Sequence, residues 1–387
     1  MGFAAKRMES ISTHFFAAHQ ERVNRLRAGG TDVINLDIGS PDLPPPQAVV
    51  DALAHAASEP GAHGYQPHDG TSALRQAWAR MYFDEFGVIL NPDTQVLPLL
   101  GSKEGIFHLI QAVVDPGDVV LLPDPGYPTY LSGTLFAGGE PFFMPLMAEN
   151  DFLPEFRKIP AEVARKAKLI WVNYPNNPTA STAPLSFYQE LVSFAREFDV
   201  LVCHDAAYSQ IYFDGHKPPS LLQVPGAEEI GVEFNSLSKS HNMAGWRVAA
   251  ALGNERVNKM LLTLKSNTDS GQFLPVMQAA ALAMTGDQTW RTVRNDRYRA
   301  RRDLVYTRLK ELGLEVRKPL ASFYLWVKTP GEKSAIQFAD QLLDECGISV
   351  APGVVFGSGG EGYVRISLVQ PVERLSEAVE RLSNLAI

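Results

Sequence analysis

Short apolar runs alternate with amphipathic segments between residues 96 and 253 of this 387-residue chain. Near-continuous apolar strands separated by helices are typical of a mostly parallel β-sheet with helices on both faces. One helical segment places six residues on a single face: Leu185, Tyr188, Leu191, Val192, Ala195 and Phe198. The apolar runs are VLPLL (96–100), VVLLP (119–123), KLIWVNYP (168–175), VLVCHDAAY (200–208), GVEFNSLS (231–238) and VAAALG (248–253). The alternation predicts an α/β fold around a mostly parallel central sheet.

The pattern changes after about residue 285, where strands and helices no longer alternate regularly. Its segments are an arginine-rich helical stretch (289–313), FYLWVK (323–328), GISVAPG (347–353), YVRISLV (363–369) and VERLSEAVERL (372–382). This mixture predicts a smaller α+β domain. The proline cluster PDLPPP (41–46) suits an extended connection. We predict a large domain over 46–285, and a small domain formed by 1–45, with an N-terminal arm, and 286–387.

Composition and charge exclude several classes of protein. The net charge of −8 argues against a nucleic-acid-binding surface, which needs clustered lysine and arginine. The two cysteines, Cys203 and Cys346, lie too far apart in sequence to suggest a disulfide framework or a metal set. No apolar run reaches the roughly 18 residues of a membrane span, and the first residues lack a signal-peptide pattern. We therefore expect a cytoplasmic protein without membrane or nucleic-acid partners and without a bound metal.

Polar residues follow several of the predicted strands, at the sheet edge where ligands of open α/β sheets bind. Ser102 and Lys103 open a helix whose free N–H groups suit a phosphate, although an ordinary helix cap has the same pattern. Tyr127 follows a strand, where local packing explains it equally well, and Asn177 lies in a turn-forming Asn-Pro pair. Asp205 ends an apolar strand, where a carboxylate needs a cationic partner unless it caps a helix.

Lys239 lies in the stretch NSLSKSHNMAGWR (235–247), among small hydroxyl residues rather than on an evidently polar surface. A free lysine has a pKa near 10.4, so a neutral amine at pH 7 costs about 4.6 kcal/mol. Desolvation or covalent attachment removes that cost. We expect Ser236 and Ser238, two residues apart on a strand, to face one side and offer hydroxyls to a phosphate, with Arg247 as a planar cation. A lysine beside a phosphate clamp and an aspartate is what pyridoxal phosphate requires.

The chain resembles the class I/II pyridoxal-phosphate-dependent aminotransferases over nearly its whole length, from NLDIGSPDLPPP (35–46) to YVRISLV. The most specific motifs are SLSKSHNMAGWR (236–247), YPNNPT (174–179) and HDAAY (204–208), in the order and spacing of the family. Ala180 follows NPT where the family often has glycine, and His241 also departs from the common pattern. The resemblance implies an aspartate-aminotransferase-like fold, a homodimer, and transamination between an L-amino acid and a 2-oxo acid.

The resemblance also implies roles for individual residues. Lys239 corresponds to the Schiff-base lysine, and Asp205 to the partner of the pyridine nitrogen. Tyr208 and Asn177 are expected at the ring hydroxyl, with Tyr127 stacked on the ring. The residues expected around the phosphate are Ser102, Lys103, Ser236, Ser238, Arg247 and, from the partner subunit across the interface, Tyr65. Arg365 is expected to bind the substrate α-carboxylate, beside Asn177 and with Gly39 allowing a close backbone approach.

The wording of GSKEGI (101–106), HDAAYSQIYFDG (204–215) and KSNTDSG (265–271) is closest to the branch with LL-diaminopimelate and alanine aminotransferases. LL-diaminopimelate, alanine and aspartate are the candidate donors, with 2-oxoglutarate as acceptor. Lys265, Gln272 and the N-terminal segment are candidates for side-chain selection. The same scaffold also supports a carbon–sulfur β-lyase. A non-catalytic ligand sensor is a more distant alternative, because the chain has no basic DNA-binding extension.

Overall fold

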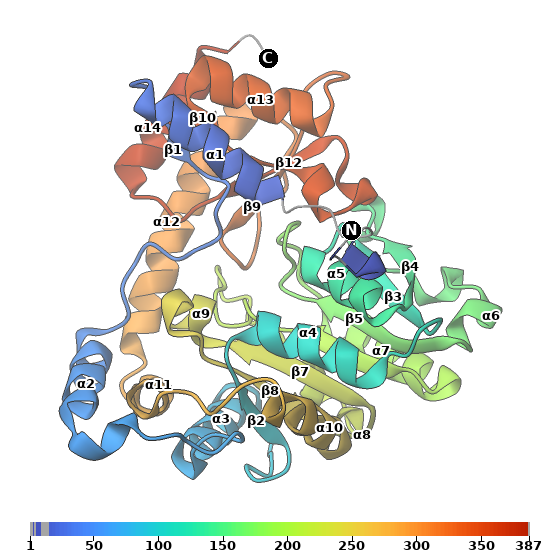
Figure 1. Cartoon of the computed structure of the whole chain (residues 1–387). Coiled ribbons are helices and arrows are strands. Elements are labelled where there is room, and N and C mark those ends of the chain that lie inside the picture. Colours follow the sequence, from blue (N-terminus) through green and yellow to red (C-terminus); the bar gives the residue numbers. More distant parts are fainter. Residues whose placement is uncertain (1–2, 4, 9–14, 386–387) are drawn as a thin grey trace.

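The computed structural model describes residues 3, 5–8 and 15–385, and these form two parts stacked one above the other in Figure 1. The lower part contains a seven-stranded sheet, and the upper part contains two small sheets. Helix α12 (Thr289–Glu311) runs alongside both parts. The limits predicted from the sequence fall just before α2 (Gln47–Ser58) and just before α12, and we propose that the two domains divide there.

The large sheet has the order β2-β8-β7-β6-β5-β3-β4. Strand β8 runs antiparallel to both of its neighbours, and the other pairings are parallel. The predicted mostly parallel sheet is therefore confirmed. Its strands are β2 (Val96–Leu99), β3 (Val119–Asp124), β4 (Glu140–Pro145), β5 (Ala167–Asn173), β6 (Leu201–Asp205), β7 (Gly231–Ser236) and β8 (Ala249–Gly253).

Helices cover both faces of this sheet because its strands are apolar on both sides. In β5, Leu169 and Trp171 belong to one buried cluster, and Ile170 and Val172 belong to the cluster on the opposite face. Successive strand residues point to opposite faces, so each face needs its own apolar cover. The remaining helices of this part are α3 (Ser72–Phe86), α4 (Ser102–Val113), α5 (Pro128–Ala137), α6 (Ala161–Ala164), α7 (Leu185–Phe198), α8 (Ala227–Ile230), α9 (Leu237–Ser240), α10 (Glu255–Ser266) and α11 (Leu274–Thr285).

The smaller part combines an antiparallel sheet, in the order β11-β12-β9, with the short parallel pair β1-β10. Its strands are β1 (Ile34–Asn35), β9 (Tyr324–Lys328), β10 (Ile348–Ser349), β11 (Ala351–Pro352) and β12 (Tyr363–Ser367). Its helices are α1 (Phe15–Ala28), α13 (Ala335–Cys346) and α14 (Val372–Ser383). The pairing of β1 with β10 joins the N-terminal segment to the C-terminal one, as the predicted α+β domain requires.

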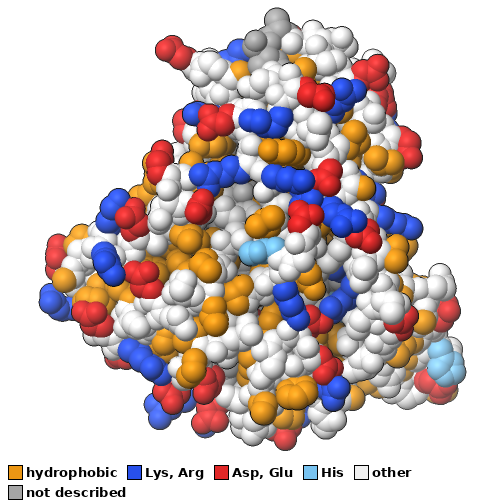
Figure 2. Space-filling view, turned by 180° about the vertical axis from the view of Figure 1, so that it is seen from behind, with side chains coloured by type: hydrophobic (Ala, Val, Ile, Leu, Met, Phe, Trp, Pro, Cys, Tyr) orange, Lys and Arg blue, Asp and Glu red, His pale blue; other side chains and the backbone are white. Residues whose placement is uncertain are grey.

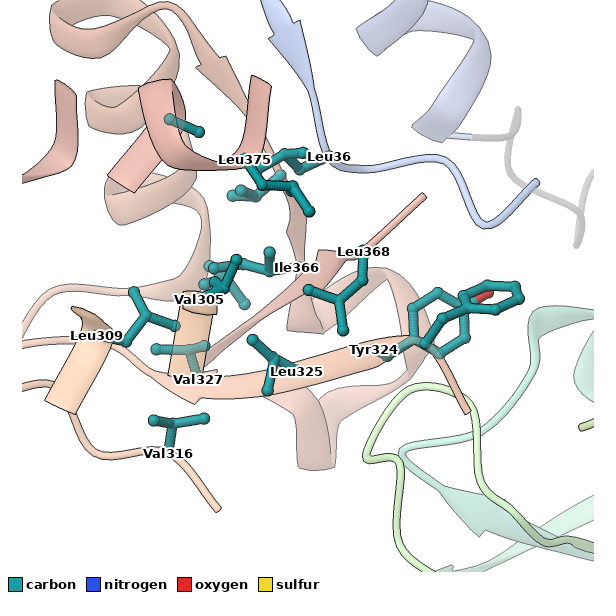
Figure 3. Close-up of a cluster of buried hydrophobic side chains, with 14 of the residues drawn as sticks. Leu36, Val305, Leu309, Val316, Tyr324, Leu325, Val327, Ile366, Leu368 and Leu375 are labelled. Atoms are coloured by element: carbon teal, nitrogen blue, oxygen red, sulfur yellow. The ribbon is translucent and has the colours of Figure 1, made fainter. Parts of the chain in front are cut away.

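One apolar cluster forms the core of the smaller part, and Figure 3 shows fourteen of its residues. Leu36 comes from the N-terminal segment, whereas Val305 and Leu309 come from α12. Tyr324 lies at one end of the cluster in Figure 3, at the first residue of β9. The same cluster includes Tyr208, which belongs to the segment that follows β6. The core of the smaller part therefore reaches the end of the large sheet.

Charged residues of both signs are interspersed on the face shown in Figure 2, as expected for a chain with a moderate net negative charge. The arginine-rich helix α12 also buries several of its cations. Arg301 pairs with Asp42 at 2.8 Å, and Arg302 pairs with Asp214 at 2.7 Å, so α12 ties distant segments together. Among the described residues, no helix has the length and hydropathy needed to cross a membrane.

Candidate active site

A cavity of about 460 Å³ opens where the parallel strands end. Segments from both parts of the molecule line it, so the cavity lies between them. Nine of the residues predicted from the sequence line this cavity: Gly39, Ser102, Lys103, Tyr127, Asn177, Asp205, Tyr208, Lys239 and Arg365. The rule that ligands bind at the carboxyl ends of strands in open α/β sheets thus leads to a real concave site.

Lys239 reaches this cavity from α9, a helix of four residues that follows β7. Its Nζ atom donates to the carbonyl oxygen of Gly39. Burial, together with the positive charges of Arg365 and Arg247, lowers the pKa of the amine to about 8, and Asp205 opposes this shift. A lysine with this pKa is neutral in roughly one molecule in ten at pH 7, compared with one in several thousand for a free lysine.

Asp205 is the last residue of β6 and is 6% exposed. Its Oδ2 atom accepts a hydrogen bond from the hydroxyl of Tyr130 at 2.9 Å. Its Oδ1 atom is buried without a hydrogen-bond partner in the described part of the chain. Burial raises the pKa of this carboxyl, although Tyr130, His204 and the nearby backbone N–H of Ala207 favour the charged form. No helix begins at Asp205, so the alternative role as a helix cap does not apply. The free oxygen suits a cationic N–H group.

Arg365 projects from β12 of the smaller part and is 4% exposed. Its guanidinium lies between the rings of Tyr324 and Phe356, at 4.3 and 4.8 Å from their centroids. Nη1 donates to Asn177 Oδ1 at 2.7 Å, and Nη2 donates to the carbonyl oxygen of Asp37. The two rings and the two hydrogen bonds restrain the position of the cation. A fixed planar guanidinium is suited to binding a carboxylate through two hydrogen bonds.

An amine of lowered pKa, a buried carboxylate with one free oxygen and a fixed guanidinium therefore face one cavity. This arrangement can bind a carbonyl compound covalently, stabilise a cationic nitrogen and hold a carboxylate. A family model described as aminotransferase class I and II matches residues 31–382.

The chain belongs to the class I and II aminotransferases. It is therefore a transferase that moves an amino group between an amino acid and a 2-oxo acid. The family resemblance inferred from the sequence motifs is confirmed.

This aminotransferase has close relatives over its full length. LL-diaminopimelate aminotransferase 2 of Trichormus variabilis is 47% identical over 384 residues, covering 99% of this chain and 98% of that protein. The substrate-bound structure of BacF from Bacillus subtilis superposes with a TM-score of 0.96 at 39% identity, covering 99% and 98% of the two chains. A double mutant of Thermus thermophilus aspartate aminotransferase gives 0.93 at 29% identity, covering 99% and 100%. The predicted aspartate-aminotransferase-like fold is thus confirmed.

Two cations lie beside the cavity in this aminotransferase: Lys103 in the first turn of α4, and Arg247 close to Gly101, which precedes that helix. Gly101 has φ +91° and lies so close to Arg247 that a Cβ atom would be 2.0 Å from Nη2. The positive φ therefore favours glycine here, and a Cβ atom would also displace the end of the Arg247 side chain. Arg247 donates to the carbonyl of Ala244 at 2.9 Å and to Ser238 Oγ at 3.4 Å. Arg247 and Lys103 line a second cavity, of about 450 Å³, next to the first.

The expectation that Ser236 and Ser238 lie on one strand is wrong. Strand β7 ends at Ser236, and Ser238 already belongs to α9. Ser236 caps this helix, because its Oγ accepts from the N–H of Ser238 at 3.1 Å and donates to the carbonyl of Val248 at 3.2 Å. Small hydroxyl residues compete for backbone groups in this way at helix starts. Neither serine lines the large cavity, and Ser238 remains next to Arg247.

Three other sequence candidates lie away from this cavity. Tyr65 is 94% exposed on its own subunit. Lys265 is buried in α10 and pairs with Asp269 at 2.8 Å and with Glu104 at 3.6 Å. Gln272 donates to the carbonyl of Arg247 at 2.8 Å. Lys265 and Gln272 therefore already hold structural partners in this chain.

Sequence reasoning missed several residues that line the cavity: Asp37, Ile38, Pro128, Asn173, Ala207, Tyr324 and Phe356. Asn173 ends β5, beside Asp205 at the end of β6, so the strand-end rule that found Asp205 applies to it as well. It donates to the carbonyl of Asp205 at 2.6 Å and accepts from the N–H of Asn177 at 2.8 Å. Tyr324 and Phe356 come from the smaller part, where no sequence signal indicated which residues face the larger one.

Proposed function

We propose that this aminotransferase uses pyridoxal 5′-phosphate held through Lys239, and that it transfers the amino group of LL-diaminopimelate to 2-oxoglutarate. The observation that carries the cofactor assignment is the juxtaposition of three groups on one cavity: the amine of Lys239, the free oxygen of Asp205 and the guanidinium of Arg365. The name and 47% identity of the Trichormus variabilis relative support the donor.

The cavity fits this cofactor in two independent respects. The buried Oδ1 of Asp205 lacks a donor among the described residues, and a protonated pyridine nitrogen provides one. At the other side, the first turn of α4 and the guanidinium of Arg247 stand next to each other, as a phosphate site requires. When bound, pyridoxal phosphate supplies a ring that accepts electron density from the substrate Cα.

The residues of the chain then have separate tasks. Nζ of Lys239 would hold the cofactor through its aldehyde, with loss of water, and the free amine would accept the proton from the substrate Cα. In the chain without a ligand the pKa of this amine is about 8, close to neutral pH, where a general base is most effective. Asp205 keeps the ring nitrogen protonated, and Tyr208 and Asn177 are assigned to the ring hydroxyl. Tyr127, half-buried directly before α5, provides an aromatic face for the ring.

Arg365 binds the α-carboxylate of either substrate, and Asn177 holds it in position through the 2.7 Å hydrogen bond. The cation lies on the smaller part of the molecule, whereas Lys239 and Asp205 lie on the larger one. A bound substrate therefore contacts both parts at once. This spanning arrangement orients the Cα–H bond relative to Nζ of Lys239, which is the positional contribution to catalysis.

A spectrophotometric screen tests the proposal. Purified holoenzyme is mixed with LL-diaminopimelate, L-alanine or L-aspartate, and the loss of the aldehyde absorbance of the cofactor is followed. Glutamate formed from 2-oxoglutarate is measured in parallel. We expect LL-diaminopimelate to give the highest kcat/KM, and Lys239→Ala to bind cofactor without turnover. Faster reaction with another donor would overturn the donor assignment and leave the reaction class intact.

The same assay separates transamination from β-elimination. A carbon–sulfur lyase would release pyruvate and ammonia from a cysteine conjugate without any 2-oxo acid acceptor. We expect no such release at a rate comparable with transamination. Retention of full amino transfer by Lys239→Ala would instead contradict the assigned role of the lysine.

We further propose a homodimer in which Tyr65 reaches the phosphate of the neighbouring subunit. The support is its exposure, because an almost fully exposed tyrosine in an irregular segment suits contact with a second copy. We also propose a cytoplasmic location, which is supported by two cysteines that are both unpaired.

A further inference from the structure

Tyr324 contacts both the guanidinium of Arg365 and the hydroxyl of Tyr208. It opens β9, is 1% exposed and lines the large cavity. Its hydroxyl oxygen is 2.9 Å from that of Tyr208, and its ring centroid is 4.3 Å from Cζ of Arg365. Two chemically different contacts therefore meet on a single residue.

The rings of Tyr324 and Phe356 both lie against the guanidinium of Arg365. A cation held over an aromatic face is attracted by the ring quadrupole, most strongly where water is excluded. The hydrogen bonds to Asn177 and Asp37, together with the two rings, restrain the position of the cation. The Nε atom of Arg365 stays buried without a partner in the described chain. The ring thus orients the cation without occupying its donors.

The hydroxyl of Tyr324 contacts other groups of the site than its ring does. Besides bonding to Tyr208, it fills the space above Gly39, where a Cβ atom would be 1.8 Å from the tyrosine oxygen. The carbonyl oxygen of Gly39 in turn accepts from Lys239. Burial raises the pKa of Tyr208, and the neighbouring hydroxyl of Tyr324 raises it further. The hydroxyl is therefore placed to affect the phenol and the backbone that surround the reactive end of the site.

We propose that Tyr324 is a positioning residue that couples the two halves of the site: its ring holds the carboxylate-binding Arg365, and its hydroxyl holds Tyr208. This inference rests on the proposed function, since Arg365 and Tyr208 are assigned there to the substrate carboxylate and to the cofactor ring. Through Tyr324, the smaller part of the molecule contacts Tyr208, which is assigned to the cofactor ring. No separate cofactor contact from that part is needed.

A neighbouring tyrosine offers a matched control. Tyr298 is also fully buried, belongs to the same apolar cluster and packs on Phe323 at 5.5 Å, as the ring of Tyr324 does at 4.9 Å. Its hydroxyl has no hydrogen-bond partner in the described part of the chain. Tyr298→Phe therefore removes a buried phenol oxygen from the same core without touching Tyr208.

The experiment compares Tyr324→Phe, Tyr324→Leu and Tyr298→Phe. In cofactor-free protein, glutarate binding is measured by isothermal calorimetry, which requires no turnover. We expect Tyr324→Leu to weaken glutarate by about tenfold through the lost ring contact, and Tyr324→Phe to stay within about twofold. In holoenzyme, the pH titration of cofactor absorbance should shift in Tyr324→Phe, with kcat lowered by about threefold to tenfold and KM nearly unchanged. Tyr298→Phe should match wild type in all three measurements.

The inference is overturned if Tyr324→Leu binds glutarate as wild type does, or if Tyr324→Phe leaves the cofactor titration unmoved. It is also overturned if Tyr298→Phe reproduces the changes, because a general packing defect would then explain them. If Tyr324→Leu does not fold, Tyr324→Met, which fills more of the space without an aromatic face, takes its place under the same criteria. Failure of the wild-type holoenzyme to transaminate would instead contradict the proposed function, and glutarate binding distinguishes the two failures.

Discussion

Tyr130 donates its hydroxyl hydrogen to Oδ2 of Asp205 across 2.9 Å, while its ring stacks on Trp171 at 4.9 Å with an interplanar angle of 7°. The stacked ring fixes the hydroxyl, and the hydroxyl fixes the carboxylate. The other oxygen, Oδ1, has no hydrogen-bond partner among the described residues. An aromatic pair in the core thus determines which carboxylate oxygen remains available to a ligand.

Removing this hydroxyl should weaken cofactor binding. In Tyr130→Phe the buried carboxyl of Asp205 loses a donor that favours its charged form, so its pKa should rise further. We expect the Kd for pyridoxal phosphate, measured by equilibrium dialysis, to increase roughly threefold to tenfold. Tyr188→Phe is the control, because its hydroxyl bonds to His204, one residue before Asp205, at 3.1 Å. Equal effects of the two variants would contradict the explanation.

Lys239 should destabilise the cofactor-free protein near neutral pH. Its pKa is about 8 in the folded chain and 10.5 as the ordinary value, so between these pH values the unfolded chain binds more protons. The free energy of unfolding therefore rises with pH across this window. Lys239→Met should raise stability at pH 7 by about 1–3 kcal/mol, and the gain should shrink towards pH 10.

Thermal unfolding midpoints of cofactor-free protein at both pH values provide the measurement. Lys103→Met, at an exposed lysine on the rim of the same cavity, is the matched control. A gain for Lys239→Met that is the same at pH 7 and pH 10 would show that packing, rather than charge burial, causes it.

The substitution Arg365→Lys should impair both half-reactions, because the amino acid and the 2-oxo acid each carry the carboxylate that Arg365 is proposed to bind. Lysine places a point charge where the fixed guanidinium lies, and it cannot keep the bonds to Asn177 and Asp37 while also binding a carboxylate at two points. We expect kcat/KM for amino acid and for 2-oxo acid to fall by about 100-fold or more, with most of the change in KM. Steady-state kinetics with each substrate varied in turn measures this. Arg374→Lys, at a surface ion pair with Asp32, should change neither value.

Mixing two inactive subunits should restore activity if Tyr65 acts across the interface. A subunit with Tyr65→Ala keeps its own Lys239, and a Lys239→Ala subunit supplies an intact Tyr65. Each hybrid dimer then contains one complete site. After unfolding and refolding an equimolar mixture, we expect activity to rise above that of either variant, up to about one quarter of wild type for random pairing. If Tyr65 serves its own subunit, the mixture stays at the average of the two variants.

The part of the site on the large sheet could be predicted because strand order brings strand ends together. Asp205 and Lys239 both follow apolar runs, and the parallel arrangement places those ends on one edge. The error at Ser238 had a local cause. A helix of one turn starts directly after Ser236, and no hydrophobic period of that length is visible in the sequence.

The smaller part contributed residues that the sequence did not indicate. Tyr324 appeared only as the beginning of an apolar strand, and a strand pattern does not tell which end meets another domain. Its position depends on the pairing of β9 with β12 and on the docking of that sheet against the segment after β6. Arg365 was identified through family resemblance, whereas its aromatic neighbours depend on the tertiary arrangement alone.

The antiparallel direction of β8 determines where Arg247, the cation assigned to the phosphate, lies. The last residue of a parallel strand lies at the rim that lines the cavity, whereas the antiparallel β8 begins at that rim and places Arg247 there, two residues before its first residue. If β8 ran parallel to its neighbours, Arg247 would lie at the opposite edge of the sheet. That edge is roughly 16 Å away, which is the length of a five-residue strand. The tight return from α9 into an antiparallel strand thus brings Lys239 and Arg247, eight positions apart in sequence, to the same rim, where we propose that they bind opposite ends of one small molecule.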